Sequence, residues 1–126
     1  MKALITGASS GIGYNMAKYL NSMGYSLVLV ARDKEKLQKI QKELSGEVKI
    51  VVADLSNESK LKELYVLCKN DNIDILVNNA GFGLFGEFTE TDLNQELEMI
   101  DVNIKAVHIL TKLFLKDMKK RNKGYI

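Results

Sequence analysis

The sequence predicts an α/β fold built on a doubly wound parallel sheet. Short apolar runs alternate with longer segments whose apolar residues recur every three or four positions, and this alternation is typical of strand-helix-strand units. The short runs are rich in Val, Ile and Leu on both faces. Burial on both faces favours parallel strands covered by helices on each side.

The expected strands and helices follow each other with few ambiguities. The strands are expected at Lys2 to Thr6, Ser26 to Ala31, Val48 to Ala53 and Asp74 to Asn78. The helices between them are marked by Ile12, Met16, Ala17, Leu20 and Met23, by Leu37, Ile40 and Leu44, and by Leu61, Leu64 and Cys68.

Residues typical of helix starts and helix ends stand at the expected boundaries of these elements. Asp33 and Ser56 stand where N-caps belong, and Gly24 and Gly46 stand where helices end. A loop at Gly81 to Phe88 precedes a helical region from about Thr91 to Arg121, and a fifth strand is expected to start at Gly124 to Ile126.

Length and composition indicate one globular domain over residues 1–126. Apolar residues make up 46% and charged residues 27% of the chain, the usual balance of ordinary globular proteins. The longest apolar runs, Ser26 to Ala31 and Ile73 to Val77, are far shorter than the roughly 20 residues that span a bilayer. The N-terminus lacks the pattern of a signal peptide, so we expect a cytoplasmic protein with no membrane partner.

Other classes of function are disfavoured by charge and by cysteine and histidine usage. The net charge of +2 is small, and the basic stretch from Lys116 to Lys123 is typical of a solvated helix end, so no nucleic-acid partner is expected. No Cys/His cluster has metal-ligand spacing, so no metal is expected. We interpret Cys68 as a buried core residue and His108 as an ordinary helix residue.

A glycine-rich turn, Thr6-Gly7-Ala8-Ser9-Ser10-Gly11-Ile12-Gly13, joins the first strand to the first helix. Gly7 permits a tight exit from the strand, Gly11 permits close approach of a pyrophosphate, and Gly13 permits close packing of the helix on the sheet. The helix start would then direct free N–H groups at phosphates. The alternative is a glycine turn without a ligand.

The spacing Thr-Gly-x-x-x-Gly-x-Gly resembles that of the short-chain dehydrogenase/reductase family, and it differs from the Thr-Gly-x-x-Gly-x-x-Gly pattern of the extended sugar-nucleotide epimerases. The resemblance to the short-chain family extends over the whole chain. The resemblance implies a Rossmann-type NAD(P)-binding half-domain with strand order 3-2-1-4, truncated after the start of the fifth strand. It also implies that cofactor contacts come from Gly7, Ser9, Ser10, Gly11, Ile12 and Gly13.

The end of the second strand bears on which cofactor is used. Relatives that prefer NAD place an acidic residue where this chain has Ala31, and relatives that prefer NADP hold the 2′-phosphate where this chain has Arg32. The resemblance therefore implies NADP(H) rather than NAD(H). The alternative is that Arg32 is a surface residue beside Asp33.

Three further segments match the family. Asp54-Leu55 follows the third strand, where relatives contact the adenine amino group, and Asn78-Asn79-Ala80-Gly81 matches the family's Asn-Asn-Ala-Gly motif. In that motif the small residues let the backbone pass close to the adenosine ribose and the asparagine amides tie neighbouring strands together, so the resemblance implies cofactor contacts at Asn79, Ala80 and Gly81. Asn103 matches the helical asparagine that anchors a water in the proton relay, and it is the one catalytic residue implied here.

The family's catalytic Ser and Tyr-x-x-x-Lys lie beyond the fifth strand, and we expect residues 1–126 alone to be inactive for this reason. Tyr14 with Lys18 and Tyr65 with Lys69 match the spacing formally but fall in the first and third helices, so we interpret both as coincidences.

The predicted function is that of an NADP(H)-dependent oxidoreductase acting on a small carbonyl or alcohol substrate. A homo-oligomer through the helix around Asn103 to Met118 is expected, since its apolar residues cover more than one face. The alternatives are a non-catalytic nucleotide-binding module and a dimerisation module with a vestigial site. Phe82, Leu84 and Phe85 are as well suited to packing on the core as to facing a substrate, so the substrate stays open.

Overall fold

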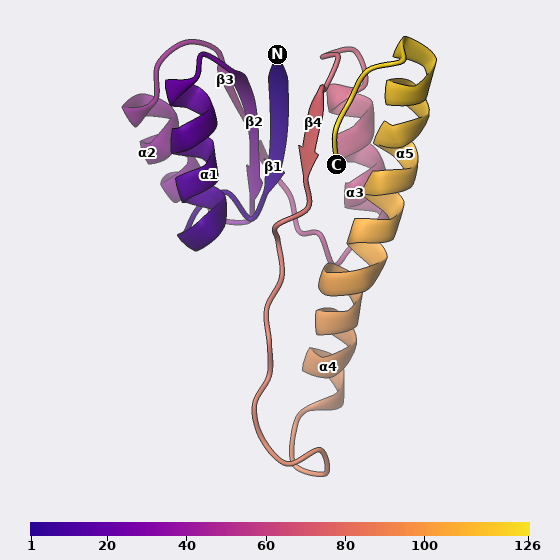
Figure 1. Cartoon of the computed structure of the whole chain (residues 1–126). Helices are drawn as coiled ribbons and strands as arrows, with labels where there is room; N and C mark the ends of the chain where they lie inside the picture. The colour runs from indigo at the N-terminus through magenta and orange to yellow at the C-terminus, as the bar shows by residue number, and fades with distance from the viewer.

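A four-stranded parallel sheet with helices on both faces forms the centre of the computed structural model, which describes residues 1–126 (Figure 1). The strands are β1 (Lys2–Thr6), β2 (Ser26–Ala31), β3 (Val48–Val52) and β4 (Ile75–Val77). Their order is β3-β2-β1-β4, and every neighbouring pair is parallel, which confirms the predicted topology.

The helices divide between the two faces of the sheet (Figure 1). Their bounds are α1 (Gly11–Ser22), α2 (Lys34–Glu43), α3 (Glu58–Cys68), α4 (Leu93–Ile100) and α5 (Ala106–Arg121). Helices α1 and α2 cover one face, and α3 and α5 cover the other. None of them is long and apolar enough to cross a bilayer.

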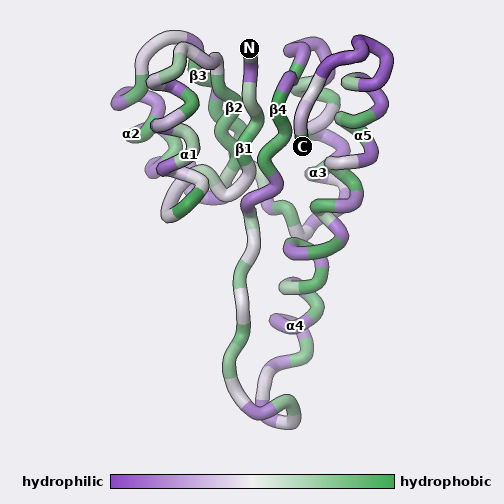
Figure 2. Tube along the Cα trace, in the orientation of Figure 1, coloured by the Kyte–Doolittle hydropathy of each residue, from purple (hydrophilic) through white to green (hydrophobic).

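Alternation along the strands builds two separate apolar layers. Leu4, Val28 and Val30 face α3 and α5, where Phe114 and Leu110 complete the layer. Their neighbours along the chain, such as Ile5 and Leu29, face α1 and α2 instead. The strands are accordingly hydrophobic at nearly every position, whereas the helices alternate in character (Figure 2).

The predicted N-cap is confirmed for α2 and is wrong for α3. Asp33 caps α2 by accepting a hydrogen bond from the backbone N–H of Lys36 at 3.1 Å. The N-cap of α3 is Asn57 and not Ser56, because the Asn57 side chain reaches the N–H groups of the first turn. The hydroxyl of Ser56 is instead turned back to Asp54.

In place of the expected fifth strand, Gly124 to Ile126 form one isolated bridge beside β4. Tyr125 forms a parallel bridge with Ile75, through hydrogen bonds from Tyr125 N–H to the Asp74 carbonyl at 2.8 Å and from Leu76 N–H to the Tyr125 carbonyl at 3.0 Å. The C-terminal residues therefore lie along the outer edge of β4 (Figure 1).

The helical region predicted as continuous from Thr91 to Arg121 has three parts. A π-helical turn, η1 (Asp101–Lys105), separates α4 from α5. The segment between β4 and α4, together with α4 itself, projects from the carboxyl edge of the sheet as an arm (Figure 1). We call residues 81–105 the helical arm.

Candidate functional site

A cleft of about 610 Å³ opens at the carboxyl edge of the sheet. It is lined by Gly7, Ser9, Ser10, Ile12, Ala31, Arg32, Asp33, Lys36, Ala53, Asp54, Leu55, Asn79, Ala80, Gly81, Phe82 and Val102. All of the predicted cofactor-binding residues lie on it except Gly11 and Gly13. Residues that follow each of the four strands thus converge on one cleft, as expected at the switch point of a doubly wound sheet.

The three glycines of the turn are required for different physical reasons. Gly7 has φ +64°, and a Cβ there would lie 2.9 Å from both the Ala80 Cα and the Asn79 amide nitrogen. A Cβ on Gly13 would overlap the Gly7 carbonyl and the same amide, so Gly13 permits close packing of α1 on the turn that follows β1. Gly11 has φ +56° with open space around it, so it is selected by backbone conformation.

The start of α1 is left without a side-chain cap. Its N-cap, Ser10, makes no side-chain hydrogen bond to the helix, and its first turn holds no acidic residue. The first N–H groups of a helix have no intrahelical partner and carry a partial positive charge. An uncapped helix start beside an open cleft fits an anionic group such as a pyrophosphate.

Thr6 and Asn79 fix the wall opposite this helix. The Thr6 hydroxyl accepts hydrogen bonds from the N–H groups of Asn79 and Ala80, each at 3.0 Å, and donates to the Val77 carbonyl at 3.3 Å. The Asn79 amide donates to the carbonyls of Thr6 and Gly7 at 3.0 and 3.1 Å. Asn78 ties the same segment to Thr111 of α5. The role of Thr6 was not predicted, although the threonine was visible at the start of the glycine motif.

Two cations stand at the end of the cleft below β2. Arg32 is 69% exposed in its side chain, and its guanidinium lies 3.5 Å from the carboxylate of Glu98. Lys36 was missed by the sequence analysis. The sequence feature that could have indicated Lys36 is the N-cap at Asp33. This cap places Lys36 in the first turn of α2 and therefore near the end of β2.

Asp54 is a carboxylate held in place on the wall of the cleft. The Ser56 hydroxyl and backbone N–H donate to its Oδ1 at 2.7 and 3.0 Å. These two hydrogen bonds, with the charge of Arg32, hold the pKa of Asp54 below its ordinary value. Asp54 is therefore an acceptor for a donor such as an amino group.

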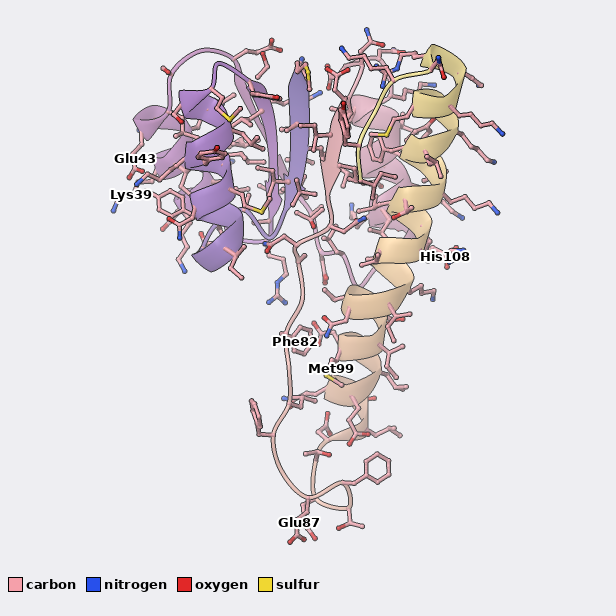
Figure 3. The ribbon with its side chains drawn as sticks, in the orientation of Figure 1. Lys39, Glu43, Phe82, Glu87, Met99 and His108 are labelled. Atoms are coloured by element: carbon pink, nitrogen blue, oxygen red, sulfur yellow. The ribbon has the colours of Figure 1, made fainter.

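Asn103 does not line the cleft but fixes one of its walls. Its Oδ1 accepts from the Phe82 N–H at 3.0 Å, and its amide nitrogen donates to the Phe82 carbonyl at 2.7 Å. A side chain on Gly81 would lie 2.9 Å from the same Oδ1. Phe82 and Met99 lie between the two limbs of the helical arm (Figure 3). Asn103, within the π turn, thus holds the segment after β4 against the helix.

The tyrosines with formal lysine spacing lie outside the cleft. The Tyr14 hydroxyl donates to Glu43 and the Tyr65 hydroxyl donates to Asp117, each at 2.7 Å. These hydrogen bonds raise the pKa of both tyrosines, which is the opposite of what a proton donor needs near neutral pH.

Neither of the other two candidate groups belongs to the cleft. Burial raises the pKa of the Cys68 thiol, and His108 points outward from α5 (Figure 3). No group of three or more His, Cys, Asp or Glu residues is arranged to hold a metal ion.

Comparison with known proteins agrees with this architecture. A family model described as short chain dehydrogenase matches residues 1–126. Uncharacterized oxidoreductases of Staphylococcus epidermidis and Staphylococcus aureus are 38% and 35% identical, and each comparison covers 98% of this chain and 55% of the relative. The chain belongs to the short-chain dehydrogenase family, and it spans about half the length of these curated relatives.

Solved structures show the same fold. A metagenomic short-chain oxidoreductase in complex with NADP has a TM-score of 0.92 and 36% identity, over 98% of this chain and 59% of that one. A short-chain dehydrogenase from Sphingobium yanoikuyae in complex with NADPH has a TM-score of 0.90 and 33% identity, over 98% and 50%.

Proposed function

We propose that this chain forms the cofactor-binding part of an NADP(H)-dependent oxidoreductase that interconverts a carbonyl and an alcohol. The observation that carries the proposal is the chemistry at the end of β2, where the apolar Ala31 and the cationic Arg32 both line the cleft. A cofactor with only ribose hydroxyls would be better served by a carboxylate at this point.

The charges around Arg32 support a phosphate in preference to a hydroxyl. Lys36 adds a second cation to the same end of the cleft. Oδ1 of Asp33 accepts from the Lys36 N–H and Oδ1 of Asp54 accepts from Ser56, so the carboxylate paired with Arg32 is that of Glu98. An arginine fork can bind phosphate oxygens in a bidentate manner, which a lysine cannot.

The remaining residues of the cleft fit the rest of a dinucleotide. The uncapped start of α1, with Gly11, would hold the pyrophosphate, and Asn79-Ala80 would flank the adenosine ribose. Asp54 would accept a hydrogen bond from the adenine amino group, while Leu55 would contact the ring. When bound, the nicotinamide cofactor supplies or accepts the hydride.

Asn103 would contribute to the reaction by position. Its side chain holds Phe82 at the entrance to the cleft, and it fixes the wall beside which a nicotinamide ring would lie. We also infer that the protein forms a homo-oligomer through the helix around Asn103 to Met118, whose residues Ile104 and Leu115 are 63% and 49% exposed.

The activity of the full-length protein tests this proposal. We expect it to consume NADPH with a panel of ketones and aldehydes, at a kcat/KM higher with NADPH than with NADH. Arg32→Ala should lower the value for NADPH about ten-fold or more and leave that for NADH unchanged, since charge-assisted hydrogen bonds contribute about 1.5 to 3 kcal/mol. Equal use of both cofactors, or no effect of the substitution, would contradict the proposal.

A further inference from the structure

An ion pair joins Arg32, which lines the cleft, to Glu98 of the helical arm. Arg32 follows β2, whereas Glu98 belongs to α4 in the helical arm, and their Nη1 and Oε1 atoms are 3.5 Å apart. Phe82 and Val102 of the arm line the same cleft as Arg32 and Lys36. The contact therefore joins the end of β2 to α4 through two residues that are 66 positions apart in the sequence.

Glu98 differs from the other carboxylates near Arg32 in having no second partner. Oδ1 of Asp33 accepts from the Lys36 N–H at 3.1 Å. Oδ1 of Asp54 accepts from the hydroxyl and N–H of Ser56. The Glu98 carboxylate has a single ion-pair partner, Arg32, and takes part in no side-chain hydrogen bond.

We propose that Glu98 is a specificity-determining residue that competes with the 2′-phosphate of the cofactor for Arg32. This inference rests on the proposed use of NADP(H). A guanidinium that pairs with a phosphate gives up its carboxylate partner, so the ion pair with Glu98 is lost when the 2′-phosphate binds Arg32. The Glu98 carboxylate therefore weakens binding of a cofactor that carries a 2′-phosphate. The affinity for ligands without a 2′-phosphate does not depend on Glu98.

Two small probes separate this effect from binding of the rest of the cofactor. Adenosine 2′,5′-bisphosphate carries the 2′-phosphate, and AMP lacks it. Both are titrated calorimetrically at low salt into the full-length wild-type protein and into Glu98→Gln, Arg32→Ala and the double variant. Glu87→Gln is the matched control, because it removes the same charge from the tip of the arm, away from the cleft (Figure 3).

Glu98→Gln should bind the bisphosphate about two- to five-fold more tightly, the range expected for release of an exposed ion pair, with AMP affinity unchanged. Glu87→Gln should match the wild type, and Arg32→Ala should abolish the gain in the double variant. No gain in Glu98→Gln, an equal gain for AMP, or a gain that survives the loss of Arg32 would overturn the inference.

These outcomes are distinct from failure of the proposed function. That failure would appear as equal binding of the two probes in the wild type, in Glu98→Gln and in Arg32→Ala. A wild type that prefers the bisphosphate through Arg32, with Glu98→Gln unchanged, would instead contradict the role of Glu98 alone.

Discussion

The Thr6 hydroxyl connects β1 to the segment after β4 through one donated and two accepted hydrogen bonds. Thr6 is only 2% exposed, so its hydroxyl has little access to water as a substitute partner. Removing an acceptor from buried N–H groups costs their full desolvation. The geometry of the Asn79-Ala80 wall therefore depends on Thr6, a residue that does not itself line the cleft.

Thr6→Val should destabilise the protein by about 1 to 3 kcal/mol, because the Ala80 N–H loses its acceptor while the side-chain shape is kept. The Asn79 N–H loses one of its two acceptors and keeps the Val77 carbonyl. Urea unfolding measures this effect. Thr89→Val, at an exposed position of the arm, is the control and should change little. A Thr6→Val protein as stable as the control would show that the hydroxyl is dispensable.

Asp74 is the other buried polar residue, at the opposite edge of the sheet. Its carboxylate accepts from the Lys2 N–H at 2.9 Å and pairs with Lys123 at 3.1 Å and Arg121 at 3.4 Å. Burial by itself raises the pKa of Asp74, but the Lys2 N–H and the two cations outweigh it and lower the pKa below its ordinary value. Asp74 thereby fastens the C-terminal residues to β4.

Because the pKa of Asp74 is lower in the folded state, its contribution to stability is fully present above the unfolded-state pKa of about 3.9 and is lost as the pH falls through the folded-state pKa. We expect Asp74→Asn to be less stable than the wild type at neutral pH, and the difference to narrow as the pH falls below about 5. Unfolding free energies measured from pH 7 to pH 3 test this. A difference that stays constant over that range would contradict it.

At the scale of single residues, the sequence was most informative where backbone geometry selects the residue. Gly7 and Gly11 have the positive φ angles that their motif implies, and Asp33 is the predicted cap. Ser56 and Asn57 could not be ranked as caps from sequence, since both side chains can accept from a helix start. The Arg32–Glu98 pair was also not predictable, because it depends on the position of the arm in space.

The elements of the sheet were predictable because strand and helix periods differ. Two-sided burial of β1 and β2 left a continuous apolar pattern in the sequence. The π turn at η1 left no such mark, since α4 before it has no buried residue that would define an apolar stripe. Buried positions recur every fourth residue in α5, at Ala106, Leu110, Phe114 and Met118, while α4 has none.

The π turn accompanies the two hydrogen bonds between Asn103 and the Phe82 backbone. We expect Asn103→Ala to loosen the segment after β4, with hydrogen exchange of the Phe82 amide about five-fold faster, as expected for the loss of about 1 kcal/mol. Asn103→Asp keeps the acceptor of this amide and should retain most of its protection. Exchange measured by NMR tests both variants, and equal exchange rates in Asn103→Ala and the wild type would contradict the assignment.

On the scale of the whole molecule, apolar side chains are exposed at the surface of the helical arm and α5. Leu93, Leu97, Ile100 and Ile104 are exposed by 65%, 50%, 46% and 63%. Such a contiguous apolar surface is typical of an interaction site. A groove beside it is lined by Ile104, Val107 and Leu115 together with His108 and several lysines.

We expect self-association through this surface, since a two-fold dimer would bury it in both copies. Light scattering coupled to size exclusion should give at least a dimer, and Ile104→Glu with Leu115→Glu should shift it towards the monomer. A pair of exposed lysines on α2, Lys39→Glu with Lys42→Glu, controls for added negative charge away from this groove. A monodisperse wild-type species of monomer mass at tens of micromolar would contradict this expectation.

The most direct test of NADP(H) binding in the cleft is a crystal structure of the full-length protein with NADP⁺. We expect the 2′-phosphate within hydrogen-bonding distance of Arg32, with Glu98 released, and the pyrophosphate over Ser9 to Gly13 at the start of α1. Adenine should lie beside Asp54 and Leu55. A dinucleotide bound outside this cleft, or one whose 2′-phosphate points into solvent while Arg32 stays on Glu98, would contradict the proposed function.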